Sequence, residues 1–218
     1  MRTLHWAIAM FLLPLGMQAQ AIDSSKVTKI EYNYLKGSKT KVLVTPQQQK
    51  AQAAYRSGYA YVNQNKYQAA ISPFMTAIKI DSTGNCGTGR NGMAHSELAY
   101  VHTRLGAYDK GLAYADKALA LNDSIPEPYL TKAVIFQQQK EFKKALQVLD
   151  TLVIRVPRYA MGFAQRGLLL DYIGQDEKAV SDYKESIRLF KEQGLNDNPS
   201  NSLIKTLQLK IENIEGQE

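Results

Sequence analysis

The chain has 218 residues, of which 44% are hydrophobic and 22% charged, and this composition excludes a disordered or collagen-like protein. Its formal net charge of +7 permits loose attraction to anionic partners but specifies none of them. With one cysteine, Cys86, and three histidines, the sequence excludes an internal disulfide and offers few ligands for a metal centre.

Residues 1–21 have the pattern of a cleaved export signal. Arg2 supplies a positive charge, Trp6 to Leu15 form an apolar stretch too short for a membrane span, and Ala19-Gln20-Ala21 is a small-x-small cleavage pattern. Pro14 and Gly16 interrupt the segment, which disfavours the alternative of an uncleaved anchor or a buried helix. We therefore expect an exported protein, periplasmic or secreted, with no stable membrane insertion after the signal is removed.

Residues 22–46 are expected to form a short β-hairpin or extended segment. Alternating patterns cover Lys26–Leu35 and Lys39–Val44, with Lys36-Gly37-Ser38 between them, and Pro46 ends the second strand. From Gln47 the apolar spacing becomes helical, so residues 47–218 are expected to form one all-α domain.

Four copies of one pattern follow. In each copy a small residue is followed, at fixed offsets, by aromatic or apolar residues and by further small residues. The four copies begin at the small residues Gly58, Ala99, Ala133 and Gly167. The intervals between them are 41, 34 and 34 residues. The longer first interval reflects an insertion around Ser82–Asn91. A 34-residue period matches two helices of about a dozen residues and two turns. We expect stacked helix pairs over residues 51–84, 92–125, 126–159 and 160–193.

A last helix is predicted over residues 201–215. Leu203, Leu207, Ile211 and Ile214 lie on one of its faces, and a stacked array needs a cap on its terminal unit. Pro73 lies inside the second helix of the first repeat, and we expect it to kink or shorten that helix because it removes a hydrogen bond to Ala69.

These repeats resemble the tetratricopeptide repeat family. The resemblance rests on the 34-residue period with its aromatic, Leu-Gly, Tyr, Ala, Phe and Pro positions, and it departs from the family pattern at Leu152, Asp176 and Ser186. It implies an all-α fold, a right-handed solenoid of four helical hairpins with a C-terminal capping helix, here preceded by the short β-hairpin. It also implies a concave groove, lined by the first helix of each repeat, that holds a peptide or a segment of another protein.

Carrying this resemblance over position by position gives the groove-facing candidates. Tyr59, Tyr100, Val134 and Leu168 occupy equivalent positions and are expected to form a row. Tyrosine offers rigid contact area with a polar tip, which suits protein recognition, although several tyrosines could instead pack beneath a neighbouring helix or the hairpin. The full set is Tyr55, Tyr59, Asn63, Ser96, Tyr100, Arg104, Leu130, Val134, Gln138, Ala164, Leu168, Asp171 and Tyr172. The lysine and asparagine set that grips a terminal carboxylate in chaperone-tail-binding members is missing, so chaperone tails are not the expected partner.

Other patterns predict no catalytic, cofactor or metal site. Residues Gly87–Gly92 match a dinucleotide fingerprint by letter, but they follow a helix and not a strand, so a flexible loop is expected. His95 and His102 are seven residues apart, too far for the usual pair of metal ligands, and are expected to be satisfied core histidines. Cys86 is either an exposed thiol that pairs with another chain or a buried side chain.

The sequence therefore predicts a protein-binding scaffold of the cell envelope, without enzyme activity, cofactor or nucleic-acid partner. Two alternatives remain open at this point. The basic charge could bind an anionic envelope polymer, or the protein could be structural and self-associate through the hairpin or Cys86.

Overall fold

The computed structural model describes residues 29–35, 38–194 and 198–216. It divides the chain at Pro46 into two units, Met1–Pro46 and Gln47–Glu218, which are described separately below. The predicted export signal at residues 1–21 lies outside the described residues.

The first unit contains an antiparallel hairpin. Strands β1 (Lys29–Leu35) and β2 (Ser38–Val44) pair with Lys29 opposite Val44 and Leu35 opposite Ser38. The hairpin agrees with the alternation in the sequence, and β2 begins one residue earlier than predicted. Residues 26–28 of the predicted first strand lie outside the described part of the chain.

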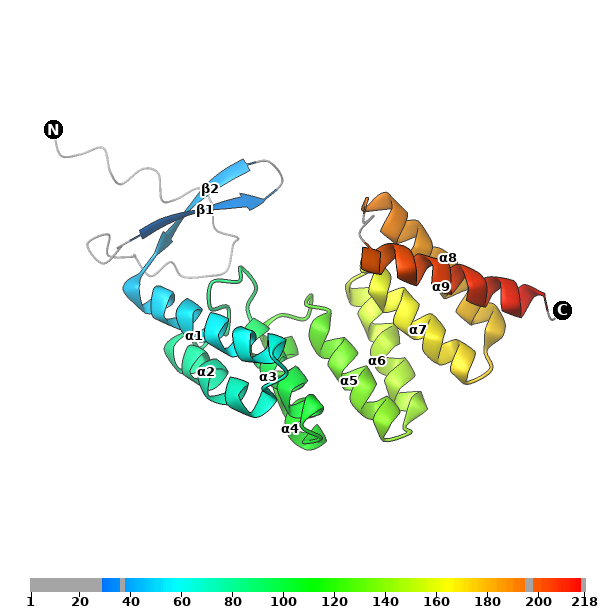
Figure 1. Cartoon of the computed structure of the whole chain (residues 1–218), viewed down its shortest axis with the longest axis horizontal. Helices are drawn as coiled ribbons and strands as arrows, with labels where there is room; N and C mark the ends of the chain where they lie inside the picture. The colour runs from blue at the N-terminus through cyan, green and yellow to red at the C-terminus, as the bar shows by residue number, and fades with distance from the viewer. Residues whose placement is uncertain (1–28, 36–37, 195–197, 217–218) are drawn as a thin grey trace. The chain divides into compact units, whose positions relative to one another are not determined.

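The second unit consists of helices that follow one another in pairs (Figure 1). From α2 onwards each helix packs against the next, and α3 also contacts α5. This arrangement confirms the predicted all-α solenoid of helical hairpins with a terminal helix. The bounds are α1 (Pro46–Asn63), α2 (Tyr67–Ile80), α3 (Met93–Arg104), α4 (Tyr108–Leu121), α5 (Glu127–Gln138), α6 (Phe142–Arg155), α7 (Ala160–Tyr172), α8 (Asp176–Glu192) and α9 (Asn198–Glu215).

The two helices of each pair are joined by the same turn. One residue in each turn has a left-handed backbone, with φ of 57° at Asn65, 74° at Gly106, 60° at Lys140 and 73° at Gly174. The N–H of the following residue then donates to a carbonyl in the last turn of the first helix, as from Lys66 to Tyr61 (2.9 Å). This bond satisfies a carbonyl that the ending helix leaves free.

The core lies at the predicted repeat positions. The first small residue of each copy is buried, and so is the residue sixteen positions later, which comes from the second helix of the same pair. These facing pairs are Gly58 and Phe74, Ala99 and Ala115, Ala133 and Leu149, and Gly167 and Tyr183.

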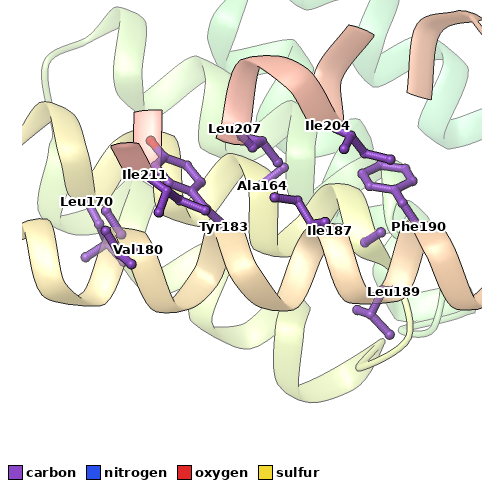
Figure 2. Close-up of a cluster of buried hydrophobic side chains, with 12 residues drawn as sticks. Ala164, Leu170, Val180, Tyr183, Ile187, Leu189, Phe190, Ile204, Leu207 and Ile211 are labelled. Carbon is purple, nitrogen blue, oxygen red and sulfur yellow. The ribbon is translucent and has the colours of Figure 1, made fainter. Parts of the chain in front are cut away.

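Helix α9 covers the fourth helix pair. Its buried residues Ile204, Leu207 and Ile211 lie against a cluster that includes Tyr183 and Phe190 of α8 (Figure 2). Leu203 and Ile214 pack on the same cluster but are only partly buried. The capping role predicted from the apolar stripe is confirmed, with Ile204 as an additional member.

Pro73 does not shorten its helix. Helix α2 has 14 residues, as do α4 and α6, so the predicted shortening is wrong. Ala69, whose carbonyl would otherwise accept the bond that Pro73 cannot donate, is exposed. Water can therefore satisfy this carbonyl, which removes much of the cost of the proline.

The insertion between α2 and α3 is a loop, as predicted, and side-chain hydrogen bonds connect its residues. One Asp81 carboxylate oxygen accepts from the Thr83 hydroxyl (2.6 Å), and the other accepts from the Cys86 N–H (2.9 Å). Cys86 is 1% exposed, and burial together with the charge of Asp81 raises the pKa of its thiol to about 12. Of the two alternatives for Cys86, the structure shows the buried side chain. None of the described helices combines the length and apolarity of a membrane span.

Candidate functional site

A groove of about 590 Å³ lies between α1, α3 and α5, the first helices of the first three pairs. Seven of the predicted groove residues line it: Tyr59, Asn63, Ser96, Tyr100, Arg104, Leu130 and Val134. Val62, Glu97, Thr103, Glu127 and Thr131 complete the lining. The groove therefore brings together residues that lie as many as 75 positions apart in the sequence.

Three large apolar side chains are exposed in this groove. Tyr59 is 46% exposed, Tyr100 36% and Val134 40%, and they occupy equivalent positions on α1, α3 and α5. Leu168, the fourth member of the predicted row, lines a second groove of about 500 Å³ together with Gln138 and Tyr172. Among the described residues, the predicted row is thus divided between two hollows.

Tyr55 belongs to the floor beneath the first groove and does not line it. Its ring packs edge-on against Phe74, with centroids 5.5 Å apart, and stacks on Tyr59 at 6.5 Å. Its hydroxyl donates to a carboxylate oxygen of Glu97 (3.2 Å). The alternative that a tyrosine packs under its neighbours therefore holds for Tyr55, whereas Tyr59 and Tyr100 remain accessible.

Arg104 fixes the orientation of Tyr100 at one end of the groove. Its guanidinium carbon lies 5.0 Å from the ring centroid of Tyr67 and 5.8 Å from that of Tyr100, and its Nη1 donates to the Tyr100 hydroxyl (3.2 Å). The rings of Tyr67 and Tyr100 also pack edge to face. Such contacts hold an exposed aromatic side chain in one orientation before any ligand arrives.

Two carboxylates at the other end were missed by the sequence reasoning. Burial raises the pKa of Glu97; the hydrogen bond from Tyr55 opposes this, and the nearby charge of Glu127 adds to it. Glu127 accepts from the Arg90 guanidinium (3.2 Å) through Oε1, while its Oε2 is buried and has no hydrogen-bond partner in the described structure. The spacing of Glu97, Tyr100 and Arg104 places all three on one helix face, and this signal could have identified Glu97.

Two of the predicted residues are engaged elsewhere. The Asp171 carboxylate accepts from Lys210 of α9 (2.6 Å) and from the Tyr183 hydroxyl (2.9 Å), and the Lys210 hydrogen bond is the main cause that lowers its pKa. Ala164 is fully buried. Both residues lie on α7. Ala164 belongs to the apolar cluster that α9 covers, and Asp171 forms an ion pair with Lys210 of α9. The capping helix therefore contacts this part of the predicted groove surface.

His95 and His102 are buried in the core. The His102 ring stacks on that of Tyr114, with centroids 5.3 Å apart. Burial is the main reason that the pKa of each histidine lies below its ordinary value. The expectation that both are satisfied is wrong for His95, because its buried Nδ1 has no hydrogen-bond partner among the described residues. Its ring lies 6.4 Å from that of Tyr114, between centroids. No group of three or more His, Cys, Asp or Glu side chains in the described part of the chain could hold a metal ion.

Comparison with known proteins identifies the repeat. Residues 51–83 match the model of the tetratricopeptide repeat. Comparison with curated proteins gives no match. Solved structures with a similar fold include three of 20–22% identity.

The first is TTC0263, a thermophilic TPR protein of Thermus thermophilus, with 22% identity over 74% of this chain and 82% of that one and a TM-score of 0.57. The second is Pseudomonas aeruginosa pilF, with 20% identity over 75% and 70% of the two chains and a TM-score of 0.59. The third is YrrB, described as a TPR protein with an unusual peptide-binding site, with 22% identity over 72% and 74% and a TM-score of 0.51. The chain therefore has the fold of tetratricopeptide repeat proteins.

Proposed function

We propose that this protein is a non-enzymatic module that binds a peptide or a segment of another protein in the groove between α1, α3 and α5. The observation that carries the proposal is the row of Tyr59, Tyr100 and Val134, three large side chains exposed together in one hollow. Apolar side chains gathered in a concave surface with a few polar groups are typical of binding sites. The peptide-binding site named for YrrB, which has a similar fold, supports the same use here.

The dimensions of the groove suit a short segment. Packed helices lie about 8–10 Å apart, and an extended chain advances about 3.3–3.6 Å per residue. A segment that crosses α1, α3 and α5 therefore needs roughly five or six residues. A helical segment would instead use side chains one turn apart for the same contacts.

The experiment selects ligands from a displayed library of random peptides about seven residues long, with the full chain as the bait. The Tyr59→Ala/Tyr100→Ala variant should weaken binding of the selected peptides by about 2–4 kcal/mol, in the range of hot-spot aromatics. Its melting temperature should stay close to that of the wild type, since both side chains are exposed.

The matched control removes apolar side chains outside the groove. Ile154 is 75% exposed and Leu209 is 59% exposed, so Ile154→Ala/Leu209→Ala deletes exposed apolar surface without changing the groove. This control should bind as the wild type does. If the tyrosine variant binds normally and loses several kcal/mol of stability, the tyrosines are core residues and the proposal is wrong.

The proposal includes a location in the cell envelope. The support is the pattern of residues 1–21, with its short apolar stretch and the Ala19-Gln20-Ala21 sequence. N-terminal sequencing of the protein recovered from cells should give a first residue of Gln20 or Ile22. Recovery of an intact chain that starts at Met1 from the membrane fraction would contradict it.

Of the two alternative functions, neither gains support at this groove. A polyanion would meet the carboxylates of Glu97 and Glu127, which line the hollow. Self-association through a Cys86 disulfide requires a thiol that the fold buries. Polyanion binding elsewhere on the basic surface would weaken steeply with added salt, whereas peptide binding in the groove should change far less.

A further inference from the structure

We propose that the segment bound in this groove is cationic, with a lysine or arginine side chain that reaches Glu97 and Glu127 and apolar residues on either side that contact Tyr59, Tyr100 and Val134. This inference rests on the proposed function and adds the chemistry of the ligand to it. It follows from the charge, the hydrogen bonding and the apolar surface of the groove.

The charge of the groove is opposite to that of the whole chain. The chain carries a formal net charge of +7, yet the charged residues that line the groove are Glu97, Glu127 and Arg104. Arg104 follows Glu97 by seven residues, so the two side chains start about 10 Å apart along α3. The Arg104 guanidinium lies over Tyr67 and Tyr100, and Arg90 pairs with Glu127, so the end of the groove with the two carboxylates keeps one negative charge without an ion-pair partner among the described residues, that of Glu97.

The carboxylates are incompletely paired. Arg90 donates to Oε1 of Glu127 from outside the groove lining, and the buried Oε2 of the same side chain receives no hydrogen bond from any described residue. Glu97 receives one from a neutral donor, the Tyr55 hydroxyl. The Glu127 side chain as a whole is 41% exposed, so an ammonium or guanidinium group in the groove can approach this carboxylate and supply a further donor and the opposite charge.

The apolar surface beside the carboxylates fits the rest of such a ligand. Lysine and arginine have long aliphatic stems, which can lie against Tyr59 or Tyr100 while the charged end reaches the carboxylates. Tyrosine rings also attract cations through their faces. A ligand with a carboxylate at this position would be repelled by Glu97 and Glu127, and a neutral side chain would supply no charge opposite to that of Glu97, so the groove selects against both.

The test uses the same library of random peptides about seven residues long, selected on the full chain. We expect the enriched peptides to share a lysine or arginine with large apolar neighbours. Replacing that residue by norleucine, which keeps the stem and removes the charge, should weaken binding about tenfold or more. The Glu97→Gln/Glu127→Gln variant keeps the shape of both side chains and should weaken the same peptides by a similar factor.

A charge-matched control separates the groove from the overall charge. Glu177 and Glu212 are exposed and do not line the groove, so Glu177→Gln/Glu212→Gln changes the net charge by the same amount. This control should leave binding unchanged. If both double variants weaken binding equally, the attraction comes from the general field of the protein and the inference is overturned.

The outcomes distinguish this inference from the proposed function. Peptides that depend on Tyr59 and Tyr100 but carry no basic residue, or that bind the Glu97→Gln/Glu127→Gln variant as well as the wild type, overturn the inference and leave the proposed function intact. A selection without any enrichment overturns both. A dimer in sedimentation that is lost in Tyr59→Ala/Tyr100→Ala identifies a second copy of this chain as the occupant and also overturns the inference.

Discussion

Gly58 of α1 faces the ring of Phe74 of α2 so closely that a Cβ atom at position 58 would lie 2.8 Å from two ring carbons. Gly167 and Tyr183 repeat this relationship in the fourth helix pair, again with 2.8 Å between the added Cβ and the ring. Where the first small residue is Ala99 or Ala133, the facing residue is Ala115 or Leu149 and not an aromatic. Both aromatic rings at this position therefore lie opposite a glycine, whose missing side chain makes room for them.

The first prediction follows from this contact. Gly58→Ala should lower the free energy of unfolding by about 1 kcal/mol, because overpacking costs about 1–3 kcal/mol and the better helix propensity of alanine returns about 1 kcal/mol. Phe74 is fully buried, so its ring has no room to move aside. Urea denaturation measures the change.

The control is a double-mutant cycle. Phe74→Leu alone leaves unfilled volume beside Gly58, and the added methyl group of Gly58→Ala occupies part of it. The double variant should therefore be more stable than the sum of the two single effects indicates, by about 1 kcal/mol. Additive effects would show that the two residues are not coupled.

The second prediction concerns the turn between α5 and α6. Lys140 has φ of 60°, in the same position where the second and fourth repeats have Gly106 and Gly174. A left-handed backbone costs a non-glycine residue about 1–2 kcal/mol, and the entropy of glycine in the unfolded chain offsets part of this. Lys140→Gly should therefore raise the free energy of unfolding by about 0.5–1 kcal/mol.

The neighbouring residue provides the control for this turn. Gln139 is also exposed but has an ordinary right-handed backbone, with φ of −80°. Gln139→Gly should therefore lower the stability, by up to about 1 kcal/mol. Changes of the same sign in both variants would mean that the left-handed conformation of Lys140 carries no strain.

The fold was predictable because its signals are local and repeated. The interval between Ala99, Ala133 and Gly167 fixed the period, and the alternation of small and large residues followed from the contacts between the two helices of a pair. The turn at Lys140 was not identified, since lysine is not a residue that marks a left-handed turn. The shortening expected at Pro73 does not occur, because the effect of a proline depends on whether water reaches the freed carbonyl, here that of the exposed Ala69.

The site was predictable in part, for a related reason. Tyr59, Tyr100 and Val134 were found by their equivalent positions in the repeats, but which of the first helices share one hollow depends on packing over many residues. Glu97 is not at a position that repeats as an acid, so the period gave no signal for it. Asp171 was expected in the groove, and its bond to Lys210 arises from the capping helix, whose exact placement the period does not specify.

The third prediction concerns the cap. Leu207 is fully buried against the fourth helix pair, and Leu207→Ala should lower the free energy of unfolding by about 2–5 kcal/mol. Leu209 is two residues away on the same helix but 59% exposed, so Leu209→Ala should change it by less than about 0.5 kcal/mol. Thermal melting of both variants tests this difference. A second experiment removes α9 by truncation after Gly194. A truncated protein that stays soluble and has the wild-type melting temperature would show that α9 is not a cap.

The last prediction concerns Glu97 and the pH dependence of stability. Burial raises the pKa of this carboxyl above its ordinary value of 4.5, so the folded chain keeps a proton that the unfolded chain has already lost. As the pH rises from 4.5 through the raised pKa, ionisation therefore favours the unfolded state. Below 4.5 the carboxyl is protonated in both states and has no such effect.

Glu97→Gln removes this ionisation and keeps a group that accepts the hydrogen bond from Tyr55. The variant and the wild type should have similar stability below pH 4.5, and the variant should become the more stable protein as the pH rises above it, with the gap constant beyond the raised pKa. His95 and His102 titrate in both proteins, so their contribution cancels in the difference. Melting curves at a series of pH values measure the gap. A variant that is more stable at neutral pH but binds cationic peptides more weakly would show that Glu97 is kept for the ligand at a cost to the stability of the fold. A stability difference between variant and wild type that is the same at every pH would contradict this role.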